Sequence, residues 1–377
     1  MISSTAGRKP VSDQSIFRPS FGNRPDRIVG RENVIEDFAR GLSRHPGSRE
    51  RARLLIGQRG MGKTVLLLEM ADRAHANEFV TARTTCGPSM LDNILDLLQR
   101  NGSPFVSEKR QPVKGFSAGA LGFSFGLTFT DEVRESYGFR VKLEMICERL
   151  AEAEKGVLLL IDEVRPELPE MRLLATTYQE LAGEGANIAV VMAGLPAIVS
   201  EVLDEATLTF LHRATKVELG PLSIPSVRAY YHSAFMRANR SLDDALLDRA
   251  AEATQGFPYL LQLLGYYLVE YCPEGEPVKP DELESAIDAA LYDFDHDVLG
   301  AMLRPLSRAD MTFLEAMSQD DRVSRVADLQ ERLGVSQGHV QSYRRRLIDA
   351  GVIYSPARGE LAFIVPRLGA FIKREML

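Results

Sequence analysis

The sequence predicts an α/β fold with a parallel sheet, followed by an all-helical segment and a small C-terminal domain. Short apolar strands alternate with helices between residues 52 and 192, and this βα order places strands parallel to one another. Apolar residues then follow helical spacing over 224–295, and three short helices precede a strand pair beyond residue 305. With 377 residues, the chain exceeds the roughly 250–300 residues at which a single core stops growing, so we expect several domains.

The composition indicates a folded protein with reduced thiols. Hydrophobic residues make up 45% and charged residues 26%, close to the averages of globular proteins, which excludes a fibrous or wholly disordered chain. Cys86, Cys147 and Cys272 are odd in number and far apart, as expected of reduced cysteines in the cytoplasm. The longest uncharged apolar run, 188–199, is shorter than the about 20 residues that cross a bilayer. We therefore expect a cytoplasmic protein without a membrane segment.

The N-terminal half contains the first elements of the sheet. Residues 1–24 lack helical and strand periodicity and are predicted to be a flexible arm. Apolar residues with helical spacing begin after Arg31, and a short strand over 52–56 leads into a glycine-rich octet. The alternation continues with a helix, a strand and a helix, over 65–76, 79–84 and 90–99. We assign residues 25–222 to this α/β core.

Residues 101–130 interrupt the alternation with a period-two pattern. Five apolar residues alternate there with glycine, serine and threonine: Leu121, Phe123, Phe125, Leu127 and Phe129. We interpret the segment as a half-buried hairpin inserted into the core; the alternative is an edge for partner binding or self-association. Beyond it the alternation resumes with helices over 141–154 and 170–182 and strands over 157–161 and 188–192.

The glycine-rich octet matches the pattern GxxxxGK[ST] of phosphate-binding loops. In such loops glycines let backbone N–H groups surround a phosphate, the lysine (Lys63) neutralises it, and the hydroxyl of Thr64 ligates magnesium. A strand before the octet and a helix after it satisfy the required geometry, so the α/β part is predicted to be a P-loop NTPase sheet. We expect ATP or ADP with Mg²⁺ at the loop, held by Gly57, Gln58, Arg59, Gly60, Met61, Gly62, Lys63, Thr64 and Val65.

Two carboxylates follow the apolar strand 157–161. Because the carboxyl ends of parallel strands line the ligand crevice of such a sheet, Asp162 and Glu163 are expected near the loop. Asp162 is predicted to hold magnesium together with Thr64, and Glu163 to be the base that polarises the attacking water. The alternative is a purely structural acidic pair, since strand ends often carry acids.

Three further motifs carry a family resemblance. They are Ile28-Val29-Gly30-Arg31-Glu32 before the first helix, Leu-Gly-Pro-Leu-Ser at 219–223, and Gly256-Phe257-Pro258. Together with the loop, they resemble motifs of AAA+-related ATPases of the STAND and archaeal-ATPase type, which are relatives of replication-origin initiators. The likeness covers roughly residues 25–377.

The resemblance implies roles for individual residues. Ile28 and Val29 would contact the adenine, and Pro258 would open a lid helix whose N-terminus faces the phosphates. Ordinary helix capping also explains Pro258. Arg213 is similar in position to an arginine that reaches a γ-phosphate in the same or a neighbouring subunit, although a surface salt bridge would also explain it.

Two departures from the family pattern predict slow hydrolysis. The strand 188–192 ends in Ala193-Gly194, where related initiators place a polar sensor, and residues 256–259 contain no sensor arginine. One interpretation of this pattern is that ATP serves as a structural ligand that is barely turned over.

The C-terminal part is predicted to comprise an all-α lid over 223–303 and a winged-helix domain over 304–377. Residues 304–375 contain twelve Lys or Arg against nine Asp or Glu, a balance of +3 in a chain of net charge -7. A recognition helix after Gly334 would expose polar and basic side chains, and Arg358 would lie on the wing. The candidate contacts to double-stranded DNA are Gln337, His339, Gln341, Arg344, Arg345 and Arg358. Alternatively, the domain packs against protein and the arginines form a solvated face.

These expectations combine into one leading hypothesis and one rival. The leading hypothesis is an ATP-binding, slowly hydrolysing switch whose nucleotide state controls a DNA-binding winged helix. The rival is a STAND-type scaffold in which nucleotide exchange drives homo-oligomer assembly or protein docking.

Overall fold

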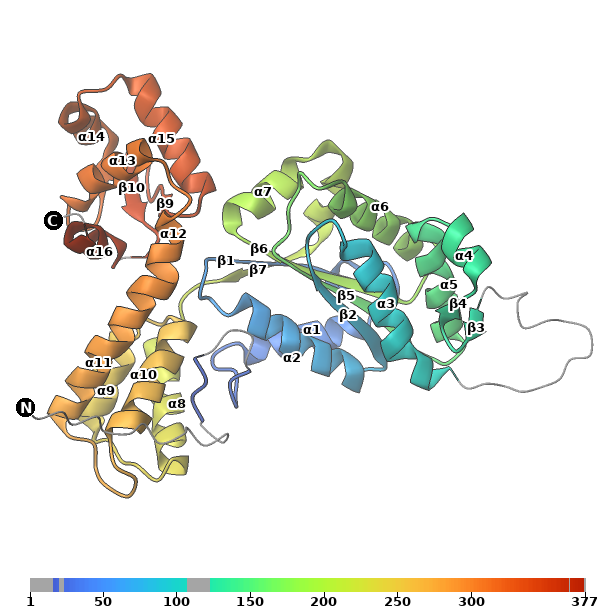
Figure 1. Ribbon diagram of the computed structural model, residues 1–377, viewed down its shortest axis with the longest axis horizontal. Helices are drawn as coiled ribbons and strands as arrows, with labels where there is room; N and C mark the ends of the chain where they lie inside the picture. The colour runs from blue at the N-terminus through green and yellow to red at the C-terminus, as the bar shows by residue number, and fades with distance from the viewer. Residues whose placement is uncertain (1–15, 20–23, 107–122, 366, 376–377) are drawn as a thin grey trace, which may run out of the picture. The chain divides into compact units, whose positions relative to one another are not determined.

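The computed structural model describes residues 16–19, 24–106, 123–365 and 367–375 (Figure 1). The chain divides into two compact units. The core unit comprises Arg31–Gly220 and Val298–Leu377, and the helical unit comprises Met1–Gly30 and Pro221–Asp297. Within the described ranges, no helix is both long enough and apolar enough to span a membrane.

The core unit contains a five-stranded, wholly parallel sheet in the order β2-β5-β6-β1-β7. Central strands of a parallel sheet are covered on both faces, which explains why every residue of β5 and β6 is buried. The strands are β1 (Ala52–Gly57), β2 (Phe79–Thr85), β5 (Gly156–Asp162), β6 (Ile188–Gly194) and β7 (Thr215–Leu219).

Helices cover both faces of the sheet. In Figure 1, α1 and α2 lie on one face, and α5, α6 and α7 lie on the other. Their bounds are α1 (Glu32–Leu42), α2 (Lys63–Ala76), α3 (Met90–Gly102), α5 (Phe139–Ala151), α6 (Pro169–Gly183) and α7 (Pro196–Asp204). Short 3-10 turns, η1 (Arg49–Arg51), η2 (Ser103–Phe105) and η4 (Ala206–Arg213), complete the connections.

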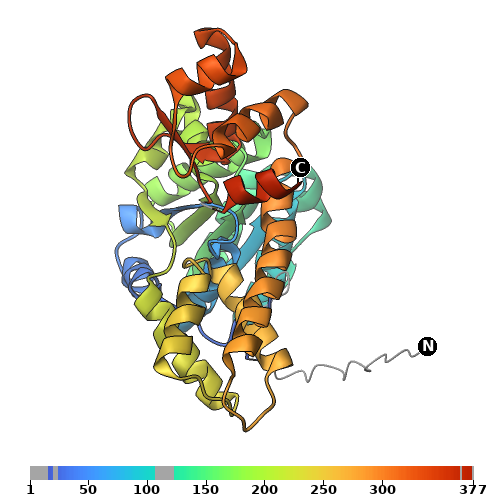
Figure 2. The same ribbon diagram turned by 90° about the vertical axis from the view of Figure 1, so that its left-hand side faces the viewer.

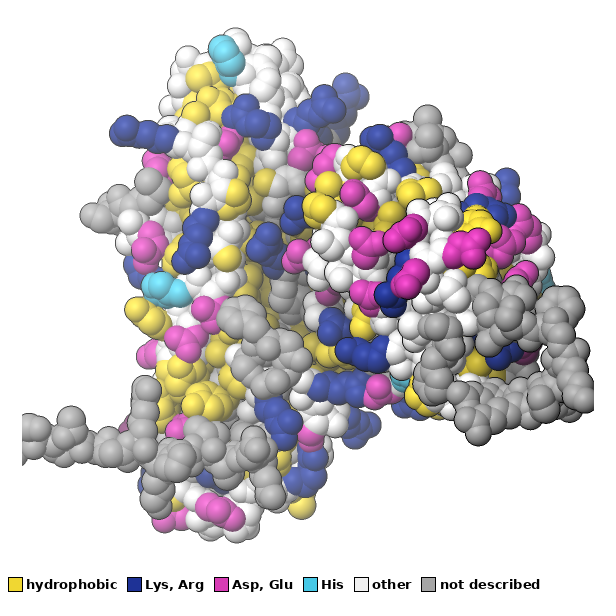
Figure 3. All heavy atoms as spheres, turned by 45° about the vertical axis from the view of Figure 1, so that its right-hand side comes forward, with side chains coloured by type: hydrophobic (Ala, Val, Ile, Leu, Met, Phe, Trp, Pro, Cys, Tyr) yellow, Lys and Arg dark blue, Asp and Glu magenta, His cyan; other side chains and the backbone are white. Residues whose placement is uncertain are grey.

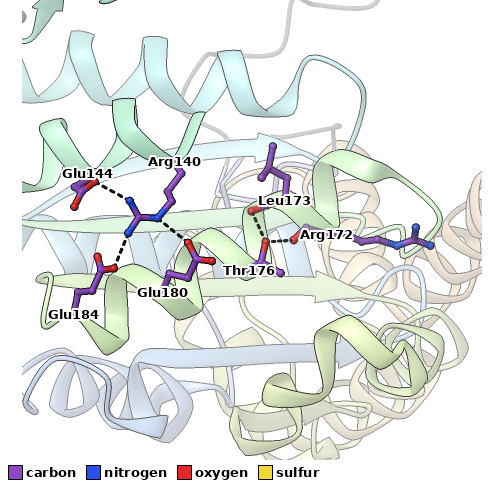
Figure 4. Close-up of polar contacts among 7 residues, drawn as sticks. All are labelled: Arg140, Glu144, Arg172, Leu173, Thr176, Glu180 and Glu184. Atoms are coloured by element: carbon purple, nitrogen blue, oxygen red, sulfur yellow. Dashed lines mark hydrogen bonds and ion pairs between the residues drawn. The ribbon is translucent and has the colours of Figure 1, made fainter. Parts of the chain in front are cut away.

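An arginine and three glutamates link α5 to α6 at the surface. The guanidinium of Arg140 lies between the carboxylates of Glu144, Glu180 and Glu184, at 2.9, 2.7 and 2.6 Å (Figure 4). The arginine side chain is about one-third exposed, so solvent screens the network and its contribution to stability is small.

The insert forms a two-stranded antiparallel pair, β3 (Phe123–Phe125) and β4 (Thr128–Phe129), followed by α4 (Asp131–Ser136). The rings of Phe123 and Phe129 stack 5.2 Å apart, and Leu127 is fully buried. The side of the hairpin that carries Leu127 therefore joins the core. Leu121, the first residue of the period-two pattern, lies outside the described residues.

Helices and a three-stranded antiparallel sheet, in the order β8-β10-β9, form the C-terminal domain. Gly334 ends α14 with φ +64°, a conformation that glycine adopts without strain, and Ser336 caps α15. The elements are α12 (Ala301–Leu303), α13 (Arg308–Ser318), β8 (Ser324–Arg325), α14 (Val326–Leu333), α15 (Gln337–Asp349), β9 (Ile353–Tyr354), β10 (Glu360–Phe363) and α16 (Leu368–Glu375). This is the order of a winged helix.

The helical unit is built from four helices: α8 (Ile224–Arg237), α9 (Asp244–Ala253), α10 (Pro258–Tyr271) and α11 (Pro280–Phe294). Helices α10 and α11 pack side by side, as Figures 1 and 2 both show. A π-helical turn, Asp295–Gly300, follows α11 directly. Residues 16–19, the described part of the expected flexible arm, pack into this unit because Phe17 is buried among its aromatic side chains.

The fold class predicted from the sequence, a P-loop parallel sheet with an all-α lid and a C-terminal winged helix, is confirmed. Sequence reasoning did not find β7, α4, α7, β8 and α16. Strand β7 is an edge strand of five residues in which Lys216 and Glu218 are exposed, so it lacks the apolar run that marks β5.

Candidate nucleotide site

The octet connects β1 to α2 at the carboxyl edge of the sheet. Gly60 and Gly62 have φ values of +78° and +79°, which only glycine adopts without strain, and Gly62 occupies the N-cap position of α2. Gly57 has little room for a side chain, because a Cβ there would lie 3.0 Å from Leu219 Cβ. The loop therefore presents backbone N–H groups and the helix N-terminus, where an anion is favoured.

The Lys63 side chain folds back over the loop. Its ammonium donates hydrogen bonds to the carbonyl oxygens of Gly57 at 2.7 Å and Gln58 at 2.9 Å. Burial lowers the pKa of Lys63 to about 8, and the nearby Asp162 carboxylate opposes that shift. A partly desolvated ammonium bound only to neutral carbonyls can exchange them for a phosphate, which is a stronger partner.

The structure brings Thr64 and Asp162 together. The Thr64 hydroxyl donates to Asp162 Oδ2 at 2.7 Å across 98 residues of sequence. Asp162 is 6% exposed, and its second oxygen accepts from the Glu163 backbone N–H at 3.0 Å. A hydroxyl and a carboxylate held this close, next to the loop, form an oxygen-ligand pair of the kind magnesium prefers.

Glu163 follows Asp162 with a left-handed backbone. Its φ is +54°, a conformation that costs a non-glycine residue roughly 1–2 kcal/mol, and its side chain is exposed. The next residue returns to the sheet, because the Val164 N–H donates to the Ala193 carbonyl at 3.0 Å. Glu163 therefore lies at the carboxyl end of β5, at the same edge of the sheet as the loop, with its side chain exposed.

The end of β6, beside the loop, carries no polar side chain. Ala193 is fully buried, and a Cβ at Gly194 would lie 2.6 Å from Val164 Cγ2 and 3.0 Å from Val199 Cγ2. A larger residue at position 194 would therefore collide with the packing around the acidic pair. The pairing of Gly194 with Ile56 places this position next to the phosphate loop.

Other predicted residues lie elsewhere. Arg213 ends η4 just before Thr215, which pairs with Arg53 at the start of β1, whereas the loop follows the other end of β1. Arg213 thus lies near the amino edge of its own sheet, and Arg59 is exposed on the loop. Ile28, Val29 and Pro258 belong to the helical unit.

The parts of the three family-like motifs that belong to that unit lie close together. The Leu222 N–H donates to the Gly256 carbonyl at 2.8 Å, and a Cβ at Gly256 would lie 2.3 Å from the Leu222 oxygen. Gly30, with φ +64°, packs against Leu222 and Ser226 at the start of α8. Pro258 is the first residue of α10.

On the recognition helix, buried Val340 and Leu347 face the domain core, and Tyr343 stacks on Phe313. Arg346 is paired with the buried carboxylate of Asp310, which gives it a structural role within the domain. The predicted DNA contacts are exposed, except that Arg344 is half-buried and donates to Gln341. In Figure 3, dark-blue Lys and Arg side chains project from the C-terminal domain.

The sheet order, the loop after β1 and the acidic pair after β5 match the P-loop NTPase fold, and two solved structures share this fold. The Walker-type ATPase PABY2304 of Pyrococcus abyssi is similar, with a TM-score of 0.67, 16% identity, and coverage of 93% of this chain and 97% of that chain. The ORC2 protein of Aeropyrum pernix, in its ADPNP–ADP complexes, gives a TM-score of 0.63 at 12% identity, with coverage of 95% and 98%. The chain thus resembles these two proteins in fold.

The family model that matches the sequence covers a smaller part of the chain than the structural comparisons do. A family model described as a domain of unknown function (DUF8462) matches residues 296–372, which include the winged helix. The sequence matches no curated protein.

Proposed function

We propose that this protein is an ATP-dependent switch: it binds Mg·ATP at the loop, hydrolyses it slowly, and uses the nucleotide state to control a DNA-binding winged helix. The observation that best supports this proposal is that Lys63, Thr64 and Asp162 lie together at one edge of the sheet. The similar ORC2 protein, solved with ADPNP and ADP, supports the choice of an adenine nucleotide.

Each loop residue has a physical role in this proposal. Backbone N–H groups from Gly57 to Val65 surround the phosphates, with Gln58, Arg59 and Met61 as contributors of backbone, and Lys63 neutralises phosphate charge. Thr64 and Asp162 would hold Mg²⁺, which would supply charge screening at the phosphate oxygens. By family resemblance, Ile28 and Val29 are the proposed base contacts, and Pro258 opens the proposed lid helix, α10.

Glu163 is the proposed general base. Its exposed carboxylate accepts a proton from water as the water attacks the γ-phosphate. Hydrolysis is slow because the end of β6 offers only Ala193 and Gly194, so no side chain there orients that water. Arg213 lies near the amino edge of its own sheet and would act on a nucleotide held by a neighbouring copy of the chain.

Phosphate release tests the hydrolytic step. We expect Glu163→Gln to lower the single-turnover rate at least tenfold while the affinity for ATP stays within about twofold, because the amide keeps the size but cannot accept the proton. Glu167→Gln, a change of the same kind at another exposed glutamate, is the control and should behave as wild type. Equal rates for wild type and Glu163→Gln would withdraw the hydrolase proposal and leave ATP as a structural ligand.

The DNA arm rests on the exposed polar face of α15 and on the wing. Gln337, His339, Gln341, Arg344 and Arg345 would read base edges or phosphates, and Arg358, beside Gly359 at φ +82°, would touch the backbone.

Fluorescence anisotropy with mixed-sequence duplexes at low, stated salt tests this arm, with and without Mg·ATP. We expect Arg344→Ala combined with Arg345→Ala to weaken binding at least tenfold and to flatten the salt dependence. Arg304→Ala with Arg308→Ala removes the same charge from exposed positions of the same region and should weaken binding much less. If both pairs bind alike, the basic residues act only through net charge, and protein docking in a STAND-type scaffold becomes the better interpretation.

A further inference from the structure

The turn that ends α15 lies against the phosphate-binding loop. Both belong to the core unit, and α15 packs against α7, beside which its end lies in Figure 1. Gly351, the second residue after α15, is buried, and a Cβ at this position would lie 3.1 Å from Gln58 Oε1 and 4.0 Å from Leu195 Cδ1. Gln58 is the second residue of the octet, and Leu195 follows the end of β6. The end of the recognition helix therefore contacts the edge of the sheet that carries the candidate nucleotide site.

The backbone of this turn requires glycine at position 351. Its φ is +68°, and the N–H groups of Gly351 and Val352 donate to the carbonyls of Ile348 and Leu347, so the chain leaves α15 through a left-handed residue. Gly334 ends α14 with a similar φ of +64°. Apart from its neighbours in the chain, no atom of the described residues lies within 4 Å of a Cβ at Gly334. The two glycines thus share a conformation, but only Gly351 also lies against the loop.

Gln58 is bound through its backbone and contacts the turn through its side chain. Its carbonyl oxygen accepts from the Lys63 ammonium at 2.9 Å and from the Met61 N–H at 3.3 Å. Its half-buried side chain reaches the turn at Gly351. In the proposed function, a phosphate competes with the Gln58 carbonyl for Lys63 and accepts hydrogen bonds from the N–H groups of the loop. Nucleotide binding therefore changes the hydrogen bonds of Gln58 directly.

We infer that Gln58 couples the loop to the winged helix: its side chain transmits occupancy of the loop to the turn that ends α15. This inference rests on the proposed nucleotide function and assigns its control step to one contact. A phosphate held by charge-assisted hydrogen bonds orders the loop, so the Gln58 side chain loses less conformational freedom when it packs against Gly351. Nucleotide binding thus stabilises the end of α15. Because coupling is reciprocal, an ordered α15 end favours nucleotide binding by the same factor.

Hydrogen exchange of the full chain, followed by mass spectrometry with and without saturating Mg·ATP, tests the coupling without DNA. We expect Mg·ATP to slow exchange in a peptide covering residues 347–353 about fivefold in the wild type, which is the lower end of typical allosteric coupling. Gln58→Ala keeps the backbone of the loop but removes the side-chain contact, so at saturation the exchange of this peptide should change by less than about twofold. Calorimetry gives the saturating concentration for each variant.

Asparagine at the two glycines provides a matched comparison. Asparagine adopts the left-handed conformation more readily than most non-glycine residues, so both substitutions preserve the helix ends. Gly351→Asn places a side chain between the turn and Gln58, and the response to Mg·ATP should fall below about twofold. Gly334→Asn places the same side chain in open space and should respond as the wild type does. Circular dichroism melting checks that each variant is folded.

The outcomes distinguish failure of the inference from failure of the proposed function. A wild-type chain that binds Mg·ATP with unchanged or faster exchange at residues 347–353 would overturn the inference and leave the nucleotide site intact. A wild-type response in Gln58→Ala would overturn it even if Gly351→Asn does not fold, and so would equal responses in the two folded asparagine variants. A wild-type chain that binds no nucleotide would instead refute the nucleotide function, and the inference with it.

Discussion

Lys63 illustrates how one residue can be prepared for a ligand before the ligand arrives. Its ammonium is bound to the carbonyls of Gly57 and Gln58, which are neutral acceptors, and burial lowers its pKa to about 8. A polyphosphate offers a much stronger electrostatic partner and favours the charged form, so binding should raise that pKa again.

Proton uptake follows from this shift. Above pH 8 the ammonium is partly neutral without ligand, so at pH 8.5 we expect ATP binding to take up roughly half a proton or more per site, and at pH 6.5 almost none through Lys63. Calorimetry in two buffers of different ionisation enthalpy measures the uptake. Lys63→Arg, which stays protonated, should take up almost none at either pH. Equal uptake by wild type and Lys63→Arg at pH 8.5 would show that another group titrates.

At the scale of elements, the start of α8 is where separate parts of the helical unit join. Gly256 approaches the Leu222 backbone closely and Gly30 lies beside the Leu222 side chain, so the turns before α8 and α10 and Gly30 form one packed junction. Gly256 has φ +75°, and the Cβ of any other residue at this position would clash with the Leu222 backbone. The resemblance identified this glycine as a signature residue, but only the contact with Leu222 gives the physical reason.

Alanine substitution separates the two effects at this junction. Gly275→Ala, at φ +84° in the same unit, would place its Cβ no closer than 3.9 Å to a neighbour, Asn239 Nδ2, and should cost about 1–2 kcal/mol through backbone strain alone. Gly256→Ala should cost that amount plus about 1–3 kcal/mol for the clash with the Leu222 backbone. Urea denaturation of the two variants compares them. Equal stabilities would show that the junction relaxes freely and does not require glycine.

The elements that sequence alone predicted share a strong local signal. Strand β5 is an unbroken apolar run, α2 follows a loop of known geometry, and α15 has a capping serine and a buried stripe at Val340 and Leu347. Strand β7 was missed because an edge strand with Lys216 and Glu218 exposed resembles a polar loop. The burial of Phe17 among the aromatic residues of α8 could not be predicted, because these partners lie more than 200 residues away in the sequence. The sequence hints at the contact only through Gly265, a glycine inside a helix.

For the candidate site, spacing was enough to name Lys63, Thr64 and Asp162, since loop geometry and strand direction determine where their side chains lie. The proposed roles of Arg213, Ile28 and Val29 depend on tertiary or quaternary arrangement, and motif spacing in the sequence does not determine that arrangement. Arg346 shows the same limit: in sequence it is one of three equal arginines, and only packing reveals its pairing with Asp310.

At the scale of the whole molecule, charge is segregated along the chain. The net charge is -7, yet residues 304–375 carry +3, so any attraction for DNA is local and should decrease steeply with salt. The family model that begins at residue 296 starts within the π-helical turn, ahead of the predicted boundary at 304. The family model therefore matches the C-terminal domain together with most of the turn that precedes it.

Calorimetric titration of the full chain with Mg·ATP tests the central claim most directly. The arrangement of Lys63, Thr64 and Asp162 predicts one site per chain with a micromolar-range Kd, loss of at least a hundredfold in affinity for Lys63→Ala, and wild-type behaviour for Lys216→Ala, a lysine exposed on β7. Absence of binding by the wild-type chain, or equal affinity of wild type and Lys63→Ala, would contradict it.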